Sequence, residues 1–202
     1  MTQKRTTARE RLLEAAGDLF YAKGITATGI DTITQSAGVA KMSLYNNFSS
    51  KADLVAAYVA ERDLTWMALY ERRAAKATSP KERILAVVDA YADHADREAS
   101  THGFKGCGMF NAAAELDADS PVRAAIKRHK DGVKGSLEKH ILEIRTATAG
   151  QASELAEMFS FILEGAMVRS GLDGNSDKIR TARKIIADIL DDKFPASAQF
   201  NA

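Results

Sequence analysis

Cysteine, proline and long apolar runs are scarce in this sequence of 202 residues. A single cysteine, Cys107, excludes an intrachain disulfide and a metal site built from several thiolates. No run approaches the ~18 apolar residues that a membrane-spanning helix needs, and the N-terminus lacks the apolar core of a signal peptide. We therefore expect a cytoplasmic protein that is stabilised by packing rather than by covalent cross-links.

The overall composition is that of an ordinary globular protein. Hydrophobic residues make up 46% of the chain and charged residues 27%, far from the low hydrophobicity of disordered segments. Residues 1–51 hold seven basic and four acidic side chains, whereas the whole chain has a net charge of only +1. This basic surplus is compatible with a polyanionic partner such as nucleic acid, and also with a solvated basic face.

Two of the three prolines stand where helices begin. Ser79-Pro80 and Ser120-Pro121 each combine a serine with a proline at the position where helices commonly begin. Strand signals are absent, because no alternation of period two is sustained and no Asn-Gly or Asp-Gly pair separates two apolar runs. The sequence therefore predicts an all-α fold.

Apolar residues at helical spacing predict nine helices, several of them ended by glycine. Thr28 with Asp31, and Ser50 with Asp53, have the spacing of capping boxes for the second and fourth helices. The expected ranges are about 12–23, 28–37, 41–47, 50–69, 79–95, a short helix after 108, 121–146, 152–170 and 179–190.

The two short helices expected between residues 28 and 47 are joined by a turn at Gly38, beside a longer N-terminal helix. Helix-turn-helix DNA readers have this arrangement, and their second helix enters the major groove. Within residues 41–48, Leu44 and Phe48 are spaced to face the core, so that the other six side chains face outward. Those six can bond to base edges and phosphates, although the same unit also occurs as a plain structural corner.

Several short sequence motifs lie between about residues 9 and 60, at fixed distances from one another along the chain. They include the leading helix from Leu12 to Gly24, Ala37-Gly38-Val39, Leu44-Tyr45, Phe48 and Ser50-Lys51. Together they resemble the DNA-binding signature of the TetR family of bacterial regulators. The chain departs from that signature at Ala40, where the family commonly has a capping serine, and at Met42, where it often has glycine.

The resemblance implies an N-terminal helix-turn-helix DNA-binding domain over residues 1–53. Thr28 would contact a phosphate from the start of the second helix, and Lys51 would hold another at the start of the fourth. The expected recognition surface is Lys41, Met42, Ser43, Tyr45, Asn46 and Asn47.

For residues 54–194 the resemblance implies a helical domain for effector binding and dimerisation, followed by a flexible tail at 195–202. The homodimer would be sealed by the last two long helices and would bind double-stranded DNA at a palindromic operator. Their apolar stripes predict an interface of Leu155, Phe159, Ile162, Ala166, Ile179, Ala182, Ile186 and Ile189. The same stripes would also suit the core of a monomer.

A glycine-rich segment from Gly103 to Gly108 precedes the short sixth helix and combines an aromatic ring, an amine and a thiol. We expect an unknown small-molecule effector near it, which would release the repressor from DNA, as is common in the family that the chain resembles. The expected lining is Tyr91, Phe104, Met109, Phe110, His129 and Phe161. Cys107 would sense electrophiles or oxidants there, unless it is ordinary packing, as free cysteines often are.

An enzyme or a metal-binding domain is the main alternative. His94, His102, His129 and His140 are scattered, and neither a zinc motif nor a nucleophile motif accompanies them. The glycines of residues 103–108 do not follow the order of a nucleotide-binding loop. We therefore expect no catalytic site, metal or cofactor.

A DNA-binding protein without a ligand is a third possibility, but the long region after residue 53 exceeds what a dimerisation arm needs.

Overall fold

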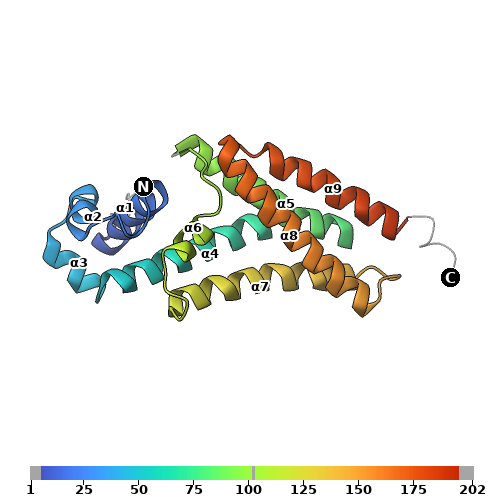
Figure 1. Ribbon diagram of the computed structural model, residues 1–202, viewed down its shortest axis with the longest axis horizontal. Helices are drawn as coiled ribbons and strands as arrows, with labels where there is room; N and C mark the ends of the chain where they lie inside the picture. Colours follow the sequence, from blue (N-terminus) through green and yellow to red (C-terminus); the bar gives the residue numbers. More distant parts are fainter. Residues whose placement is uncertain (1–5, 102, 196–202) are drawn as a thin grey trace, which may run out of the picture. The chain divides into compact units, whose positions relative to one another are not determined.

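The computed structural model describes residues 6–101 and 103–195, and within these ranges every regular element is an α-helix (Figure 1). The all-α prediction is therefore confirmed. The tail expected from residue 195 lies, after Pro195, outside the described residues. The described helices are α1 (Ala8–Lys23), α2 (Ile30–Ala37), α3 (Lys41–Asn47), α4 (Lys51–Ala74), α5 (Pro80–Thr101), α6 (Gly108–Ala114), α7 (Pro121–Leu142), α8 (Ala149–Asp173) and α9 (Asp177–Lys193).

The starts of the helices follow from local hydrogen bonds. At α4, the backbone N–H of Asp53 donates to the hydroxyl oxygen of Ser50 at 3.1 Å, as the predicted cap requires. The start of α8 differs from the prediction, because Thr148 and Gln151 form a reciprocal capping box. Gly150 therefore lies in the first turn of α8 and does not end the preceding helix.

The chain divides into two compact units, and the boundaries fall within α4, directly before α6 and within α7. Among the described residues, the first unit comprises 6–63 and 108–126, and the second comprises 64–101, 103–107 and 127–195. The short helix α6 thus belongs to the first unit and contacts α1 there. The functional boundary expected after residue 53 stays a prediction.

The core of the second unit lies where α5, α8 and α9 run side by side (Figure 1). Phe159 and Leu163 of α8 and Ile179 and Ile186 of α9 are almost completely buried there. Each such side chain contributes ~1.5–3 kcal/mol by leaving water. Apolar burial is therefore the main force that holds these helices together.

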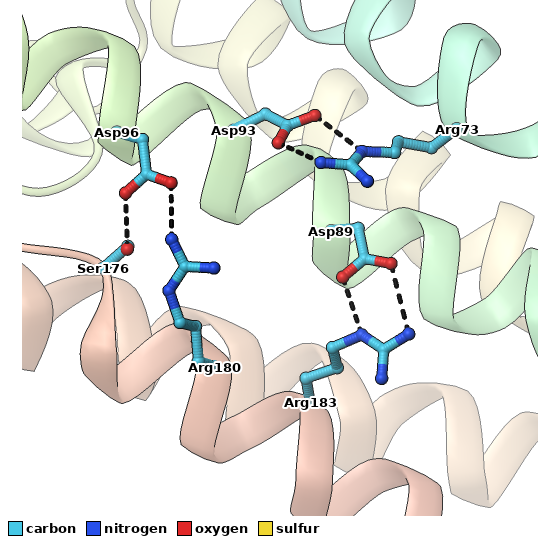
Figure 2. Close-up of polar contacts among 7 residues, drawn as sticks. All are labelled: Arg73, Asp89, Asp93, Asp96, Ser176, Arg180 and Arg183. Carbon is cyan, nitrogen blue, oxygen red and sulfur yellow. Dashed lines mark hydrogen bonds and ion pairs between the residues drawn. The ribbon is translucent and has the colours of Figure 1, made fainter.

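Three aspartates on α5 bind partners on its neighbours, as Figure 2 shows. Asp89 accepts hydrogen bonds from two nitrogens of Arg183 on α9, at 2.6 and 3.3 Å. Asp93 pairs with Arg73 on α4. Asp96 accepts from Arg180 on α9 at 2.6 Å and from the hydroxyl of Ser176 at 2.5 Å. The spacing of four and three residues along α5 lets one helix face anchor both α4 and α9.

Candidate nucleic-acid interface and effector site

In the first unit, apolar side chains anchor the inner face of α3 to the core. Leu44 is fully buried and Phe48 is only 2% exposed, so that both face the core as the spacing predicts. Between α2 and α3, Gly38 adopts a left-handed conformation with φ 61°, which favours glycine. The guanidinium of Arg11 on α1 donates to the carbonyl oxygen of Gly38 at 3.3 Å. The turn of the helix-turn-helix is therefore fixed from two sides.

The opposite face of α3 points into solvent. Met42 is 69% exposed and Tyr45 48%, and the side chains of Lys41 and Asn46 are exposed as well. The structure thus brings four of the predicted recognition residues together on one accessible surface. This surface offers a cation, a phenol, an amide and a thioether, which can contact phosphates, base edges and thymine methyl groups.

Two of the predicted recognition residues already have partners within the chain. The ammonium of Lys41 lies 2.8 Å from the carboxylate of Asp31 on α2, and hydrogen bonding to this carboxylate raises the pKa of Lys41 above its usual value. The amide nitrogen of Asn47 donates to the backbone oxygen of Ser43 at 2.7 Å, and both residues are half-buried. Lys41 would have to exchange Asp31 for DNA in order to bind it.

The expected role of Thr28 needs a correction. Its side chain is only 1% exposed, and its hydroxyl donates to the backbone oxygen of Gly24 at 2.6 Å. The cap residue of α2 is Gly29, without a side-chain cap, so that the predicted capping box with Asp31 is wrong. The hydroxyl of Thr28 closes the α1 to α2 turn and is not presented to a phosphate. Lys51 begins α4, half-buried, and its phosphate contact stays a prediction.

The α1 to α2 turn is also bonded to the end of α6, which the sequence did not indicate. The carboxylate of Glu115 accepts hydrogen bonds from the backbone N–H groups of Ile25 at 2.9 Å and Thr26 at 2.7 Å. Burial opposes ionisation of Glu115, but these two donors outweigh it and lower the pKa of the carboxyl group. Gly24 adopts a φ of 90°, which favours glycine, and a side-chain carbon there would lie 2.7 Å from the same carboxylate, so that Glu115 would have to shift.

Aromatic rings from three helices meet in the second unit. The ring of Trp66 stacks on Tyr70 with centroids 5.5 Å apart. Tyr91 of α5 and His129 of α7 contact Trp66 edge-on at 5.9 and 5.5 Å. Tyr70 in turn lies 2.6 Å, hydroxyl to Nε2, from the buried His140, whose pKa is lowered by burial. Two predicted effector residues, Tyr91 and His129, are therefore joined by a tryptophan that the prediction omitted.

An ion pair lies against the same Tyr91. The ammonium of Lys130 donates to the carboxylate of Glu164 at 2.8 Å and stands 5.3 Å from the centroid of the Tyr91 ring. Burial disfavours the charge on Lys130, but Tyr91, Cys107 and Glu164 outweigh it and raise the pKa of Lys130. For Tyr91, in contrast, burial itself raises the pKa, because it disfavours the charged phenolate, so that the hydroxyl stays protonated at neutral pH. The cluster thus holds a permanent cation beside a neutral phenol.

The remaining predicted effector residues lie in several places. Phe104 is 2% exposed and belongs to the second unit's core, against which the half-buried Cys107 also packs. Phe161 is 66% exposed on α8, away from the buried aromatic rings, and its effector role stays a prediction. Met109 is buried and Phe110 is 38% exposed, both within the first unit, and their effector roles stay predictions.

A pocket of about 440 Å³ opens elsewhere in the second unit, where α5 begins and α7 and α9 end. Pro80, Ile144, Leu190 and Phe194 form its apolar wall, and Lys81, Glu143, Arg145 and Asp191 surround it. Its lining includes none of the predicted effector residues. Its size is sufficient for a small ligand.

The expected dimer interface needs a second correction. Six of its eight side chains are buried within the chain itself, so they cannot face a partner: Leu155, Phe159, Ala166, Ile179, Ala182 and Ile186. Only Ile162 and Ile189 are partly exposed. Another face of α8 carries the exposed apolar side chains Met158, Phe161, Val168 and Leu172. The sequence alone favoured the stripe that packs inward.

The described residues contain no group of three or more metal-ligating side chains of His, Cys, Asp or Glu. His102 lies outside the described residues. No helix in the described ranges combines the length and apolar character that crossing a bilayer requires.

The two parts of the chain match two regions of one protein family. Residues 12–58 match the bacterial regulatory proteins of the tetR family, and residues 80–186 match the tetracyclin repressor-like C-terminal domain. The HTH-type transcriptional activator FasR of Mycolicibacterium smegmatis is 35% identical over 130 residues, which cover 64% of this chain and 58% of FasR. The transcriptional regulator AcuR of Cereibacter sphaeroides is 28% identical over 184 residues, 86% of this chain and 81% of AcuR.

Similarity to solved structures extends over nearly the whole chain. The crystal structure of SCO4454, a TetR-family transcriptional regulator from Streptomyces coelicolor, superimposes with a TM-score of 0.81 at 28% identity, covering 92% of this chain and 95% of that one. The match at residues 80–186 alone spans more than half of the chain. The chain therefore belongs to the TetR family and is a transcriptional regulator of that family of DNA-binding proteins, not an enzyme.

Proposed function

We propose that the chain is a homodimeric repressor that binds a palindromic operator and leaves it when a small molecule occupies the second unit. The observation that carries the proposal is the outward face of α3, with Met42, Tyr45 and Asn46 exposed on a helix anchored by Leu44. A single helix with such a face fits the major groove, which is ~12 Å wide. Because the helix is fixed from behind, its side chains can read bases in a defined register.

Dimerisation is supported by a stripe of exposed positions on α8. Met158, Phe161, Gly165, Val168 and Leu172 are all exposed and alternate at intervals of three and four residues, the spacing of a helix pair seam. Nothing lies within 4 Å of a side-chain carbon built on Gly165, so that a second helix can approach closely there. Exposed apolar patches of this kind mark interaction sites, and a second copy is the partner that a palindromic operator requires.

Repression is the direction that we favour. The names of the relatives include both activation and repression of transcription, since FasR is called an activator and KstR2 of Mycolicibacterium smegmatis a repressor. A dimer that occupies a promoter blocks transcription without further contacts, whereas activation also needs a surface that recruits polymerase. A reporter gene behind the selected operator distinguishes the two, because expression falls with a repressor and rises with an activator.

The effector would bind at the cluster of Trp66, Tyr91, Lys130 and Glu164 rather than in the pocket beside Phe194. The cluster combines aromatic surface with a few convergent polar groups, as small-molecule sites commonly do. It also contains Nε1 of Trp66 and Oε2 of Glu164, which are buried without a hydrogen-bond partner. A ligand that bonded to them would remove a cost of ~1–3 kcal/mol for each.

Selection of bound fragments from random DNA by the purified protein tests the DNA-binding part. Tyr45→Ala should weaken binding to the selected operator by ~1–3 kcal/mol, about fivefold to 150-fold, because a base contact is lost. Lys51→Gln should weaken all DNA binding and reduce the salt slope by about one unit. Met67→Ala, which truncates a 39% exposed side chain on α4, is the control and should have no effect. Equal affinity of all three variants would contradict the assignment.

A further inference from the structure

The pocket of about 440 Å³ in the second unit shares no lining residue with the effector cluster. It lies where α5 begins and where α7 and α9 end, and every residue that lines it belongs to the second unit. Its apolar wall is formed by the half-buried Pro80 and by three buried side chains, Ile144, Leu190 and Phe194. Pockets that combine an apolar wall with a few polar groups are typical sites for small molecules.

The two carboxylates that line the pocket are each bonded to a cation already. Asp191 on α9 forms an ion pair with the ammonium of Lys81 on α5. Glu143 accepts hydrogen bonds from two nitrogens of the Arg83 guanidinium, at 2.6 and 2.9 Å. Because both negative charges are compensated within the chain, a cationic ligand would have to displace Lys81 or Arg83 in order to bind there.

Arg145 differs from these four groups. It lines the pocket at an exposed position, and among the residues that the structure describes its guanidinium has no ion-pair or hydrogen-bond partner. A guanidinium presents its N–H donors in a rigid fork that matches the two oxygens of a carboxylate. Helix dipoles do not decide the preferred charge of a ligand, because α5 begins at the pocket whereas α7 and α9 end there. The uncompensated charge beside the apolar wall is therefore positive.

We propose that this pocket binds a small organic carboxylate, whose anionic group pairs with Arg145 while its apolar body lies against Ile144, Leu190 and Phe194. The ring of Phe194 suits an aryl group in that body. An ammonium has three donors, so that Lys81 can bind the carboxylate of the ligand while it keeps its bond to Asp191. This site adds to the proposed function and does not depend on it, because neither DNA nor the effector cluster takes part.

The test uses the full-length protein and 4-phenylbutanoate, which joins a carboxylate to an aryl ring through a short chain. Two compounds with the same carbon skeleton are the controls, the neutral 4-phenylbutanamide and the cationic 4-phenylbutylammonium. Isothermal titration calorimetry measures their affinities at low ionic strength, where charges are least screened. We expect one site per chain and carboxylate binding about fivefold tighter than that of the amide or more, because charge-assisted hydrogen bonds are roughly twice as strong as neutral ones.

Butanoate tests the contribution of the apolar wall without a change to the protein core. It carries the same anionic group but lacks the aryl ring. We expect butanoate to bind about tenfold more weakly than 4-phenylbutanoate or weaker still, because the ring no longer leaves water for the apolar wall. Equal affinities of these two anions would mean that the apolar wall takes no part, and would overturn the proposed site.

Variants of Arg145 test the assigned position of the anionic group. Arg145→Gln should weaken binding of the carboxylate about fivefold or more and leave binding of the amide unchanged. Arg145→Glu should reverse the order of the ligands, so that 4-phenylbutylammonium binds more tightly than 4-phenylbutanoate. Arg128→Gln is the matched control, since Arg128 is an exposed arginine on α7 that lies about 20 Å before the end of that helix. It should bind all the compounds as the wild type does.

The proposal fails if the wild type binds the carboxylate and the amide equally, or if Arg145→Gln keeps the full affinity for the carboxylate. It also fails if no compound binds at millimolar concentration, since the pocket then holds only water. All the exchanged arginines are exposed, so that their loss removes no core contact. The titrations contain no DNA, which keeps this proposal apart from the proposed function. Carboxylate binding by a protein that binds no operator would support the pocket and contradict the repressor, and the opposite result would do the reverse.

Discussion

The two units of the chain place their functional side chains in opposite ways. In the first unit, the side chains expected to read DNA project into solvent from the single short helix α3, and only their apolar anchors are buried. In the second unit, the groups expected to recognise an effector are largely buried and come from four helices between Trp66 and Glu164. DNA is a large, stiff partner that needs an outward face, whereas a small molecule needs to be enclosed.

The same contrast recurs within α8, where two phenylalanines only two positions apart lie in different environments. Phe159 is fully buried and Phe161 is 66% exposed. Phe159→Ala should lower the free energy of unfolding by ~3–5 kcal/mol, because a large core side chain leaves a cavity. Phe161→Glu should leave each copy folded but separate the dimer, since it places a charge in the apolar seam.

Denaturation at several protein concentrations distinguishes the two effects. A loss of dimerisation makes apparent stability depend less on concentration, whereas a core cavity lowers stability at every concentration. Light scattering should then show monomers for Phe161→Glu and dimers for Phe159→Ala. Dimers of Phe161→Glu at micromolar concentration would remove the exposed stripe of α8 from the proposed interface.

The two units also differ in how far the sequence alone could predict them. The face of α3 is local, because seven residues of one helix carry it, and the spacing of Leu44 and Phe48 was enough to orient the rest. The prediction for Thr28 was wrong, because its hydroxyl bonds to the preceding turn. The local sequence around a threonine in that position does not differ from the sequence around a threonine that caps the next helix. The all-α fold and the positions of most helices were predicted by the same local periodicity.

The effector cluster and the interface depend on contacts between distant parts of the chain. Lys130 and Glu164 pair across 34 residues, and no spacing rule joins residues so far apart. On α8 the sequence predicted the wrong stripe, because this helix is apolar on two faces. Periodicity finds both faces, but it cannot tell which one meets the protein's own core and which one meets solvent or a partner.

A second prediction concerns Glu115, which connects the end of α6 to the α1 to α2 turn within the first unit. Glu115→Gln should lower the free energy of unfolding by ~1 kcal/mol, because the bonds from Ile25 and Thr26 lose their charged acceptor. The folded state lowers the pKa of this carboxyl group. Its stabilisation is therefore complete above the unfolded value of ~4.3 and is lost as the pH falls through the lower folded value.

Chemical denaturation of the wild type and Glu115→Gln across the acid range checks this prediction. The difference between their unfolding free energies should be largest near neutral pH and should shrink below about pH 4. Glu154→Gln, at an exposed position on α8, is a matched control and should differ little from the wild type at any pH. A constant difference for Glu115→Gln at all pH values would mean that the charge of the carboxylate is not what holds the turn.

The smallest expected effect concerns the aspartates of α5, which join helices within the second unit only (Figure 2). The side chains of Arg183 and Asp89 are 43% and 25% exposed, so that water weakens their attraction despite the two hydrogen bonds between them. A double-mutant cycle of Asp89→Asn and Arg183→Gln should give a coupling energy of ~0.2–1 kcal/mol. This coupling should decrease between 0.1 and ~1 M salt, as the Debye length falls from ~10 to ~3 Å. A coupling energy well above ~1 kcal/mol that did not change with salt concentration would instead indicate that the pair behaves as a buried ion pair. The stability of the second unit would then depend on charge as well as on apolar packing.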